Sequence, residues 1–502
     1  MKKILWLFFI LFCLNSYALD LSDVRSRLSR DQELKFIDNI PFITDRTESQ
    51  YGKSVYSIEK KLYYVSFELK PAFKNISEII NKIQEYKPDM FKSINVFSVN
   101  TTEDRLTDIV NRLKKYINIE FISKETTKAP LGVLEDISKE PFQGGIGSGQ
   151  IPNDPLFSKQ WHLDCSNNNC NYDLKYLDFQ DYLNKNKLKR NFKNSEPVVA
   201  LIDMGFYLDT DEFKNRIWVN NQEIPNNGID DDNNGYVDDY RGVHVNPHKQ
   251  NCTPNLSSCI GDFDKAGTFK HGMVVGSIIA AATNNNKFIA GMAPADIKIL
   301  PISTENDNAT RSLYFSNGYD YILTLRKRGV NIIAYNISLG GAYDATEEKF
   351  ITEMKKYGIL SIASAGNNST NIDTDGKYNY PAALASKLDN IVSVGAINSY
   401  KAISSYSNYG NKNLSIYLPG DSISGIYYEN GKVDGRAMSG TSAAAAVMSG
   451  VLANAYWLFP NDNMIELKNK ILRNVTIFKE YANIEDEYPI KTTDFMTLTN
   501  MK

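Results

Sequence analysis

The first third of the chain alternates between strand-like and helix-like patterns of apolar residues. Residues 62–69 alternate apolar and polar positions as a half-buried strand does, and residues 94–99 and 117–121 repeat this pattern. The apolar residues within 76–83 and 106–113 recur instead at the spacing of one helix face. The patterns predict a small α+β module over about residues 60–123, large enough to fold alone.

From Pro197 onward, continuous β-branched runs alternate with longer helical stretches. The predicted strands are Val198–Ile202, Ile297–Ile302, Asn331–Ile337, Ile359–Ala363 and Ile391–Val394, and the predicted helices are Gly272–Ala282, Ser312–Arg328 and Glu347–Lys356. Strands with few polar interruptions are typical of a parallel sheet buried on both faces. The repeated order of strand and helix therefore predicts an α/β domain with a doubly wound, mainly parallel sheet, whose site forms at the carboxyl ends of the strands.

Glycine and proline gather between these two regions, from Ala129 to Pro155. Such a composition favours a flexible, exposed segment that proteases cut readily. We therefore expect a first domain over residues 19–128, a linker over 129–152 and a second domain over 153–502.

The first 18 residues have the pattern of a secretory signal. Lys2 and Lys3 precede the apolar run Ile4–Leu14, and small residues follow at Ser16 and Ala18. We expect export to a periplasmic or extracellular location. Later stretches are too short to span a bilayer, so we expect no membrane anchor in the mature form.

Composition narrows the class of partner and the redox compartment. Of the 502 residues, 42% are hydrophobic, which is enough for a sizeable core. The formal charge of -3 does not indicate the excess of positive charge that nucleic-acid binding requires. Four cysteines remain after the signal, in the close pairs Cys165/Cys170 and Cys252/Cys259. Two short-loop disulfides are expected after export, although three connectivities are possible and a zinc site is the alternative.

Four polar residues follow structural breaks at the expected edge of the sheet. Asp203 ends a buried strand, His271 opens an apolar helix, and Asn367 follows a glycine after another strand. Ser442 begins an Ala-rich helix, where unpaired backbone N–H groups lie near its hydroxyl. Each residue taken alone could have a purely structural role, and Ser442 in particular could simply cap its helix. Together they occur in the order acid, base, oxyanion donor and nucleophile.

That order excludes two rival serine hydrolases. An α/β-hydrolase places its histidine after the serine, and no histidine follows Ser442. A chymotrypsin-like interpretation would use Gly420-Asp421-Ser422, but Ile423 and Ser424 follow where glycines are needed, and the domain pattern is α/β.

From about residue 153 to 475 the chain resembles the subtilisin-like serine peptidases of the S8, or subtilase, family. The resemblance lies in the acid, base, oxyanion and nucleophile motifs, which are Ile202-Asp203-Met204-Gly205, His271-Gly272, Ala365-Gly366-Asn367 and Gly440-Thr441-Ser442. It implies a serine endopeptidase that hydrolyses peptide bonds through an acyl-enzyme, without a cofactor. It also implies that Ser338, Leu339 and Gly340 pair with a protein or peptide substrate.

The resemblance extends, more weakly, to the N-terminal module. The α+β module is similar to the family's inhibitory prodomains, which implies that residues 19–128 block the cleft until the linker is cut. Met204 and Met273 stand where the family usually has hydroxyl residues, and Ala443 and Ala446 replace Met and Pro. Two alternatives therefore remain: a catalytically weak or inactive binding protein on the same fold, and a dedicated maturation protease for one partner.

An acidic segment from Asp230 to Asp239 resembles the start of an EF-hand loop. Asp230, Asp232, Asn234 and Asp238 place oxygens at alternate positions and are the candidate calcium ligands, but Arg241 occupies the position of the bidentate glutamate. A structural calcium site and a plain acidic turn are both compatible with this segment.

Overall fold

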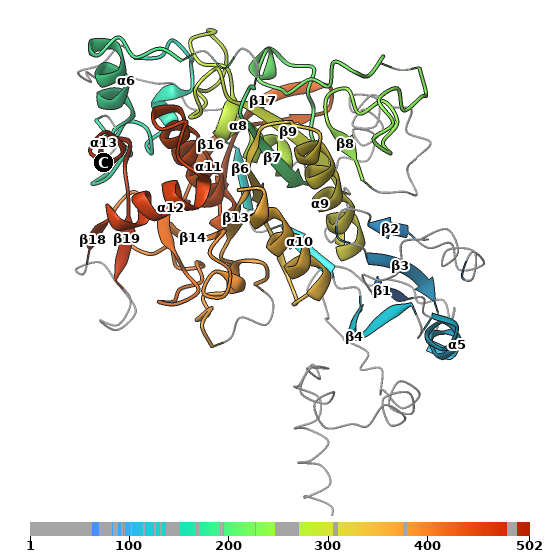
Figure 1. Ribbon diagram of the computed structural model, residues 1–502. Helices are drawn as coiled ribbons and strands as arrows, with labels where there is room; N and C mark the ends of the chain where they lie inside the picture. Colours follow the sequence, from blue (N-terminus) through green and yellow to red (C-terminus); the bar gives the residue numbers. More distant parts are fainter. Residues whose placement is uncertain are drawn as a thin grey trace, which may run out of the picture. The chain divides into compact units, whose positions relative to one another are not determined.

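The computed structural model divides the chain into two compact units, residues 1–125 and 126–502. The elements of both are labelled in Figure 1. The structure describes residues 63–69, 83, 89–91, 94, 96–101, 103–113, 116–124, 127–130, 133–136, 151–166, 170–190, 192, 195–225, 227–245, 271–304, 310–374, 379–478 and 489–501.

The first unit contains a four-stranded antiparallel sheet and a helix. The strands lie in the order β2 (Asp89–Phe91), β3 (Val96–Thr101), β1 (Tyr63–Leu69) and β4 (Ile117–Lys124), and the helix is α5 (Glu103–Leu113). Alternate residues of β1 are buried, and Phe67 stacks on Phe97 with 5.2 Å between ring centroids. The helix predicted within 76–83 lies almost entirely outside the described residues.

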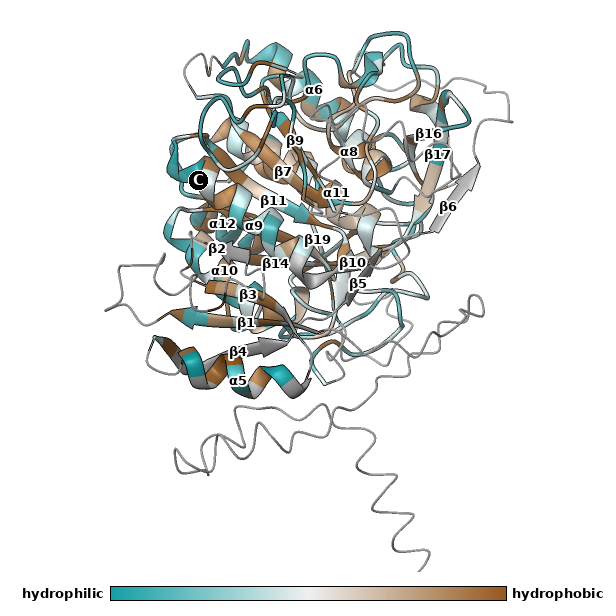
Figure 2. Ribbon diagram, turned by 90° about the vertical axis from the view of Figure 1, so that its right-hand side faces the viewer, coloured by the Kyte–Doolittle hydropathy of each residue, from teal (hydrophilic) through white to brown (hydrophobic). Residues whose placement is uncertain are grey.

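A seven-stranded parallel sheet forms the centre of the second unit and confirms the predicted α/β fold class. Its order is β15 (Ile416–Pro419), β14 (Ile391–Ile397), β13 (Leu360–Ser364), β11 (Ile332–Ile337), β7 (Val198–Asp203), β9 (Lys298–Ser303) and β8 (Val243–His244). Every residue of β7 and β11 is buried, because helices cover both faces. Figure 2 shows the hydrophobic colouring of these central strands.

Two pairs of helices cover the sheet. On one face α8 (His271–Ala280) packs against α11 (Thr441–Leu458), and on the other α9 (Ser312–Lys327) packs against α10 (Ala345–Lys356) (Figures 1 and 2). All ten residues of α8 are buried, and small residues fill the first turns of α11. The remaining described α-helices of this unit are α6 (Tyr176–Lys185), α12 (Met464–Arg473) and α13 (Phe495–Thr499), and β18 (Thr476–Phe478) pairs with β19 (Ile490–Thr492).

Two small sheets include residues 129–130 and 133–136, which are described residues at the start of the segment that was predicted to be a flexible linker. β5 (Thr127–Pro130) lies between β10 (Thr310–Arg311) and β12 (Leu339–Gly341). β6 (Val133–Asp136) pairs with β17 (Lys432–Ser439), which forms a hairpin with β16 (Ile423–Glu429). The difference has a physical reason: any extended main chain can pair with an exposed strand edge, whatever its composition.

Several other predictions concern residues that the structure does not describe. The signal segment 1–18, the glycine run at 144–149 and the pair Cys252/Cys259 lie outside the described residues. Cys165 and Cys170 form the expected disulfide. Among the described residues, we find no helix with the length and hydrophobicity that a bilayer crossing requires.

Candidate active site

Asp203 and His271 meet at the carboxyl end of β7. Nδ1 of the His271 ring lies 2.7 Å from Oδ1 of Asp203, and both side chains are fully buried. The backbone N–H of Met204 donates to the same carboxylate oxygen at 2.6 Å. A buried carboxylate is costly without such partners, so this pairing holds the ring in one orientation with its other nitrogen, Nε2, directed away from the acid.

The first turn of α8 is attached to the chain that follows Asp203. The backbone N–H groups of Gly272 and Met273 donate to the carbonyl oxygens of Met204 and Gly205, at 2.8 and 3.0 Å. These are N–H groups that a helix cannot satisfy internally. A Cβ on Gly272 would lie 3.0 Å from Cβ of Asp203, so only glycine lets the helix approach this closely.

Ser442 lies in the first turn of α11, directly after the strand β17. Its side chain is buried, and its hydroxyl donates to the backbone carbonyl oxygen of Ser338 at 3.0 Å. The hydroxyl of Ser338 in turn donates to the carbonyl oxygen of Ser442 at 3.2 Å. Because α11 packs against α8, the serine and His271 begin two neighbouring helices.

Asn367 is fixed through its side-chain oxygen. Oδ1 accepts from the backbone N–H of Thr441 at 3.0 Å and from its hydroxyl at 2.9 Å. With Oδ1 held in this way, the Nδ2 group of the same amide is directed to the opposite side as a donor. The hydroxyl of Thr441 also accepts from the backbone N–H of Gly366 at 3.1 Å, so the loop after β13 and the start of α11 form one hydrogen-bonded unit.

A second asparagine supports this loop. Asn408 donates to the carbonyl oxygen of Ala365 and accepts from the backbone N–H of Asn368, at 2.8 and 3.0 Å. Gly366 has φ of +106° there, and a Cβ would collide with the side chains of Asn408 and Asn379. The sequence pattern did not indicate Asn408 and Thr441 as supports, because no local spacing connects them to Asn367.

The structure thus joins the sequence-predicted site residues in two groups. Asp203 and His271 bond directly, and Asn367 and Ser442 are connected through Thr441. Leu339 and Gly340, the predicted substrate-binding residues, form β12 and pair with β5, while Ser338 precedes them and contacts Ser442. Such a set can supply a nucleophile, a base with its orienting acid, and an oxyanion donor.

A family model and several known proteins match this chain. A family model described as "Subtilase family" matches residues 194–489, which is more than half of the chain. The chain belongs to the subtilase family. Subtilisin-like protease 1 of Plasmodium berghei is 26% identical over 345 residues, covering 66% of this chain and 52% of that protein. The major intracellular serine protease of Bacillus subtilis is 28% identical over 266 residues, covering 53% and 69% respectively.

Solved structures show the same fold at lower identity. Fervidolysin from Fervidobacterium pennivorans, a keratinolytic enzyme related to subtilisin, superposes with a TM-score of 0.59 at 16% identity, covering 89% of this chain and 62% of that one. The epidermin leader peptide processing serine protease of Staphylococcus aureus gives 0.57 at 18% identity, covering 88% and 99%. This subtilase spans about half the length of the first curated relatives it matches, 52% and 44%.

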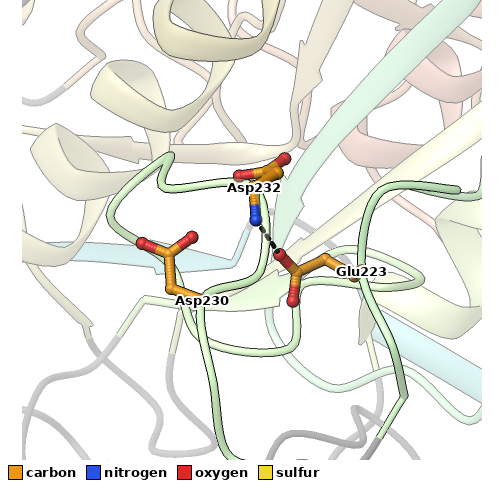
Figure 3. Close-up of side chains that lie close together, drawn as sticks. All are labelled: Glu223, Asp230 and Asp232. Carbon is orange, nitrogen blue, oxygen red and sulfur yellow. Dashed lines mark hydrogen bonds between the residues drawn. The ribbon is translucent and has the colours of Figure 1, made fainter.

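The acidic loop of this subtilase gathers three carboxylates. Oxygens of Glu223, Asp230 and Asp232 lie within 4.8 Å of one another (Figure 3). Glu223 Oε1 accepts from the backbone N–H of Asp232 at 3.2 Å, while its Oε2 is buried and has no hydrogen-bond partner among the described residues. Burial raises the pKa of the Glu223 carboxyl, and the neighbouring carboxylates raise it further.

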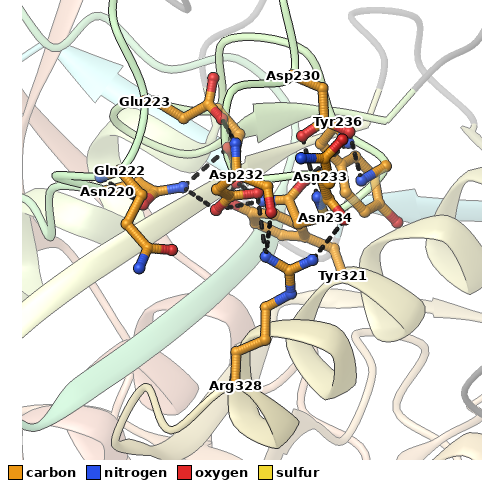
Figure 4. Close-up of polar contacts among 12 residues, drawn as sticks. Asn220, Gln222, Glu223, Asp230, Asp232, Asn233, Asn234, Tyr236, Tyr321 and Arg328 are labelled. Carbon is orange, nitrogen blue, oxygen red and sulfur yellow. Dashed lines mark hydrogen bonds and ion pairs between the residues drawn. The ribbon is translucent and has the colours of Figure 1, made fainter.

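The other two candidate ligands serve the loop itself. Asn234 Oδ1 accepts from the backbone N–H of Tyr236 at 2.7 Å (Figure 4). The carboxylate of Asp238 accepts from the backbone N–H groups of Asn227 and Gly228, at 3.0 and 2.8 Å. The structure therefore brings Asp230 and Asp232 together, but with Glu223, which lies upstream of the predicted loop and outside its spacing.

One cation already contacts this loop. Arg328 Nη1 lies 3.1 Å from Asp232 Oδ1, and the guanidinium also donates to the carbonyl oxygens of Asp232 and Asn233 (Figure 4). It neutralises part of the charge on Asp232. Both oxygens of Asp230 also accept from backbone N–H groups of the loop, those of Asn234 and Gly235, at 2.9 and 2.8 Å. Glu223 Oε2 has no hydrogen-bond partner among the described residues. Carboxylate oxygens suit a hard cation such as Ca²⁺, so the three gathered carboxylates fit such an ion, with Glu223 in the set and without Asn234 and Asp238.

Proposed function

We propose that this subtilase is an exported serine endopeptidase that acts on proteins or peptides. The observation that carries the proposal is the buried contact of 2.7 Å between Asp203 and His271 at the head of α8, beside the helix that begins with Ser442. A structural ion pair would not need a serine at the start of the adjacent helix, nor an asparagine fixed by that serine's neighbour.

Each residue has a role in the proposed acyl transfer. His271 takes the proton of the Ser442 hydroxyl as the oxygen attacks a peptide carbonyl, and Asp203 stabilises the charged ring. Asn367 Nδ2 and the backbone N–H of Ser442 stabilise the oxyanion. The protonated ring then gives its proton to the leaving amine, and water hydrolyses the acyl-enzyme to release the second product.

The chain's own N-terminal region is proposed to restrain this activity. β5 pairs on one side with Leu339 and Gly340, the residues predicted to bind substrate, and on the other with β10. Main-chain pairing at both edges is the mode in which an extended peptide is recognised. A segment of the same chain that holds these edges would compete with any other substrate until it is cut.

A fluorophosphonate probe tests the proposed chemistry. We expect the probe to label wild-type protein at Ser442 and to leave Ser442→Ala unlabelled, with loss of cleavage of an unfolded protein such as reduced casein. Ser449→Ala is the matched control, because Ser449 lies on the same helix and its hydroxyl bonds to Asn336 and to the carbonyl oxygen of Ala445, at 3.1 and 3.0 Å, rather than at the start of the helix. Equal labelling of wild type and Ser442→Ala would refute the proposal.

A catalytically weak binding protein is the second candidate. It is favoured by one observation: Asp203 Oδ2 is buried and has no hydrogen-bond partner among the described residues, at the position where the family usually supplies a hydroxyl and this chain has Met204. Probe labelling without any casein cleavage would support this candidate. Cleavage of casein at many bonds would count against both it and a protease dedicated to one partner.

We also propose that a calcium ion, when bound, stabilises the acidic loop through Glu223, Asp230 and Asp232. The unpartnered oxygen of Glu223 supports the proposal, because a buried carboxylate oxygen costs stability unless a donor or cation satisfies it. The ion has no part in the peptide-bond chemistry.

A further inference from the structure

The residues on both sides of Asn367 are hydrogen-bonded to one residue, Asn408. Its side-chain Nδ2 donates to the carbonyl oxygen of Ala365 at 2.8 Å, and its backbone N–H donates to the carbonyl oxygen of Gly366 at 2.9 Å. Its side-chain Oδ1 accepts from the backbone N–H of Asn368 at 3.0 Å. Asn408 therefore fixes the main chain directly before and directly after Asn367.

The same amide oxygen holds the loop further along the chain. Oδ1 of Asn408 also accepts from the backbone N–H and from the hydroxyl of Thr370, at 3.0 and 3.1 Å. Because an amide oxygen has two lone pairs, three donors use its accepting capacity in full. The side chain is fully buried, and a Cβ on Gly366 would lie 2.3 Å from its Nδ2. The amide is thus packed tightly against the loop, with both of its ends bonded.

Asn408 is itself held on the central sheet. The hydroxyl of Ser407 accepts from the backbone N–H of Ala396 in β14 and donates to the carbonyl oxygen of Asn408, both at 2.9 Å. The backbone N–H of Ser404 donates to the carbonyl oxygen of Ala396 at 3.0 Å. A site supported from a strand is positioned more precisely than one that depends on a loop alone. Through Asn408, the loop around Asn367 is fixed relative to β14.

A separate contact holds the far end of this loop. The carboxylate of Asp373 accepts from three consecutive backbone N–H groups, those of Asn411, Lys412 and Asn413, at 2.8, 3.0 and 2.7 Å. These bonds do not involve the Asn408 side chain. Loss of that side chain should therefore displace the loop locally rather than detach it from the sheet.

We propose that Asn408 is a positioning residue for the oxyanion donor and acts on catalysis through the place that it gives to Asn367. Thr441 fixes the Asn367 amide through Oδ1, whereas Asn408 fixes the main chain that carries this amide. An oxyanion donor must lie about 2.7–3.1 Å from the oxygen that becomes charged, and a misplacement of about 1 Å can cost about 10² in rate. This inference rests on the proposed endopeptidase function and adds to it a fully buried residue.

The kinetics of single and double variants test this role. The substrate is fluorescein-labelled reduced casein, and turnover by the full-length chain is expressed per site that the fluorophosphonate labels at completion. Asn408→Ala should lower kcat about tenfold or more and change KM by less than about twofold. Asn367→Ala should lower kcat further. The double variant should lie within about twofold of Asn367→Ala, because an absent donor cannot be misplaced.

Asn390→Ala is the matched control. Asn390 is also fully buried, and its Nδ2 donates to the carbonyl oxygens of Ile351 and Ile359, at 2.9 and 3.3 Å. It directly precedes β14, at the amino end of the strands and therefore at the edge of the sheet away from the site. Its loss should lower the melting temperature but leave kcat within about twofold of the wild-type value.

A second variant keeps the test decisive if Asn408→Ala does not fold. Asn408→Asp has the same shape and keeps an oxygen for Asn368 and Thr370, but its carboxylate cannot donate to the carbonyl oxygen of Ala365. We expect a lower kcat again, with the same lack of further loss in the Asn367→Ala background. Circular dichroism confirms that each variant is folded.

The outcomes separate this inference from the proposed function. Wild-type kcat in both Asn408 variants would overturn the positioning role and leave the endopeptidase intact. An equal fall in kcat with and without the Asn367 side chain would also overturn it, because independent effects multiply. Failure of both variants to fold would assign Asn408 to stability and overturn the proposal as well. Absence of labelling and of casein cleavage in wild type would overturn the proposed function and this inference with it.

Discussion

The hydroxyl of Ser442 donates its hydrogen bond to the carbonyl oxygen of Ser338, at 3.0 Å. A hydroxyl carries one hydrogen, so in this arrangement it cannot also donate to His271. The proposed attack on a substrate would require the side chain to turn about its Cα–Cβ bond, which needs no movement of the helix. In the structure the backbone around Ser442 is in place, and a rotation of this one side chain would free its hydroxyl for the proposed role.

Asn367→Asp is expected to lower kcat while the loop keeps its structure. Aspartate retains an oxygen for Thr441 but places a second oxygen where the Nδ2 donor was. We expect a loss of about 10²–10³ in kcat with little change in KM, a range measured for one such donor in another subtilase rather than in this chain. Steady-state kinetics measures it, with Asn368→Ala, an exposed neighbour, as the control. A variant at full activity would show that Asn367 is not the donor.

Gly272→Ala should separate the base from the acid. The added methyl group would lie 2.7 Å from a ring carbon of Phe206 and 3.0 Å from Cβ of Asp203, so the start of α8 must move away. We expect a fall of at least tenfold in kcat with a folded protein. Gly276→Ala on the same helix is the control, because the nearest atom to its methyl group would be a flexible leucine methyl at 3.3 Å, and the next two lie at ordinary contact distances of 3.5 and 3.6 Å. Equal kinetics for the two variants would mean that this close approach does not matter for turnover.

His162 should make the protein sensitive to acid. Burial lowers the pKa of its ring from 6.5 to about 3, and neither ring nitrogen has a hydrogen-bond partner among the described residues. Between these two values the unfolded chain binds a proton that the folded chain does not, so stability falls as the pH decreases from 6.5, by up to about 1.4 kcal/mol per pH unit.

A leucine at this position tests that linkage. The pH dependence of the free energy of unfolding should be shallower for His162→Leu than for wild type below pH 6.5, measured by denaturant titration. The two proteins should converge in slope above that pH. Parallel curves throughout the acid range would show that the ring is not held neutral.

Calcium should raise the melting temperature through Glu223. An ion that binds only the folded state adds about 2.7 kcal/mol when its concentration is 100 times Kd. We expect added Ca²⁺ to raise the Tm of wild type, EGTA to reverse the change, and Glu223→Gln to respond far less. Glu196→Gln is the control, because this surface carboxylate pairs with Lys298 rather than with the acidic loop. A Tm that is independent of Ca²⁺ in wild type would refute the site.

The sequence predicted the central sheet because its strands are buried on both faces. β7 and β11 are apolar almost without interruption, and short runs of this kind are typical of parallel strands covered by helices. Asp203 and His271 were predicted as site residues because one ends a predicted strand and the other begins a predicted helix. Pairing between β5 and β12 could not be predicted, because main-chain hydrogen bonds do not depend on which side chains the strand carries. The glycine and proline residues of this region predicted a flexible segment instead.

The residues that hold the Asn367 loop in place could not be predicted from the sequence, for a related reason. Asn408 and Thr441 act on the Asn367 loop from positions that only the fold brings near. Glu223 joins Asp230 in the same way, across a turn that the EF-hand spacing does not include. Periodicity describes each element by itself, whereas these contacts depend on how one loop meets another.

β10 and β12 bind β5 through its main chain, and every protein offers the same main-chain groups. If other targets enter as β5 does, a helix or a paired strand must first open over several residues before it can be digested. The rate at which a target is cleaved would then depend more on its local unfolding than on its amino-acid composition. A compact protein would survive in the cold and be degraded on warming, at bonds chosen by where it loosens first.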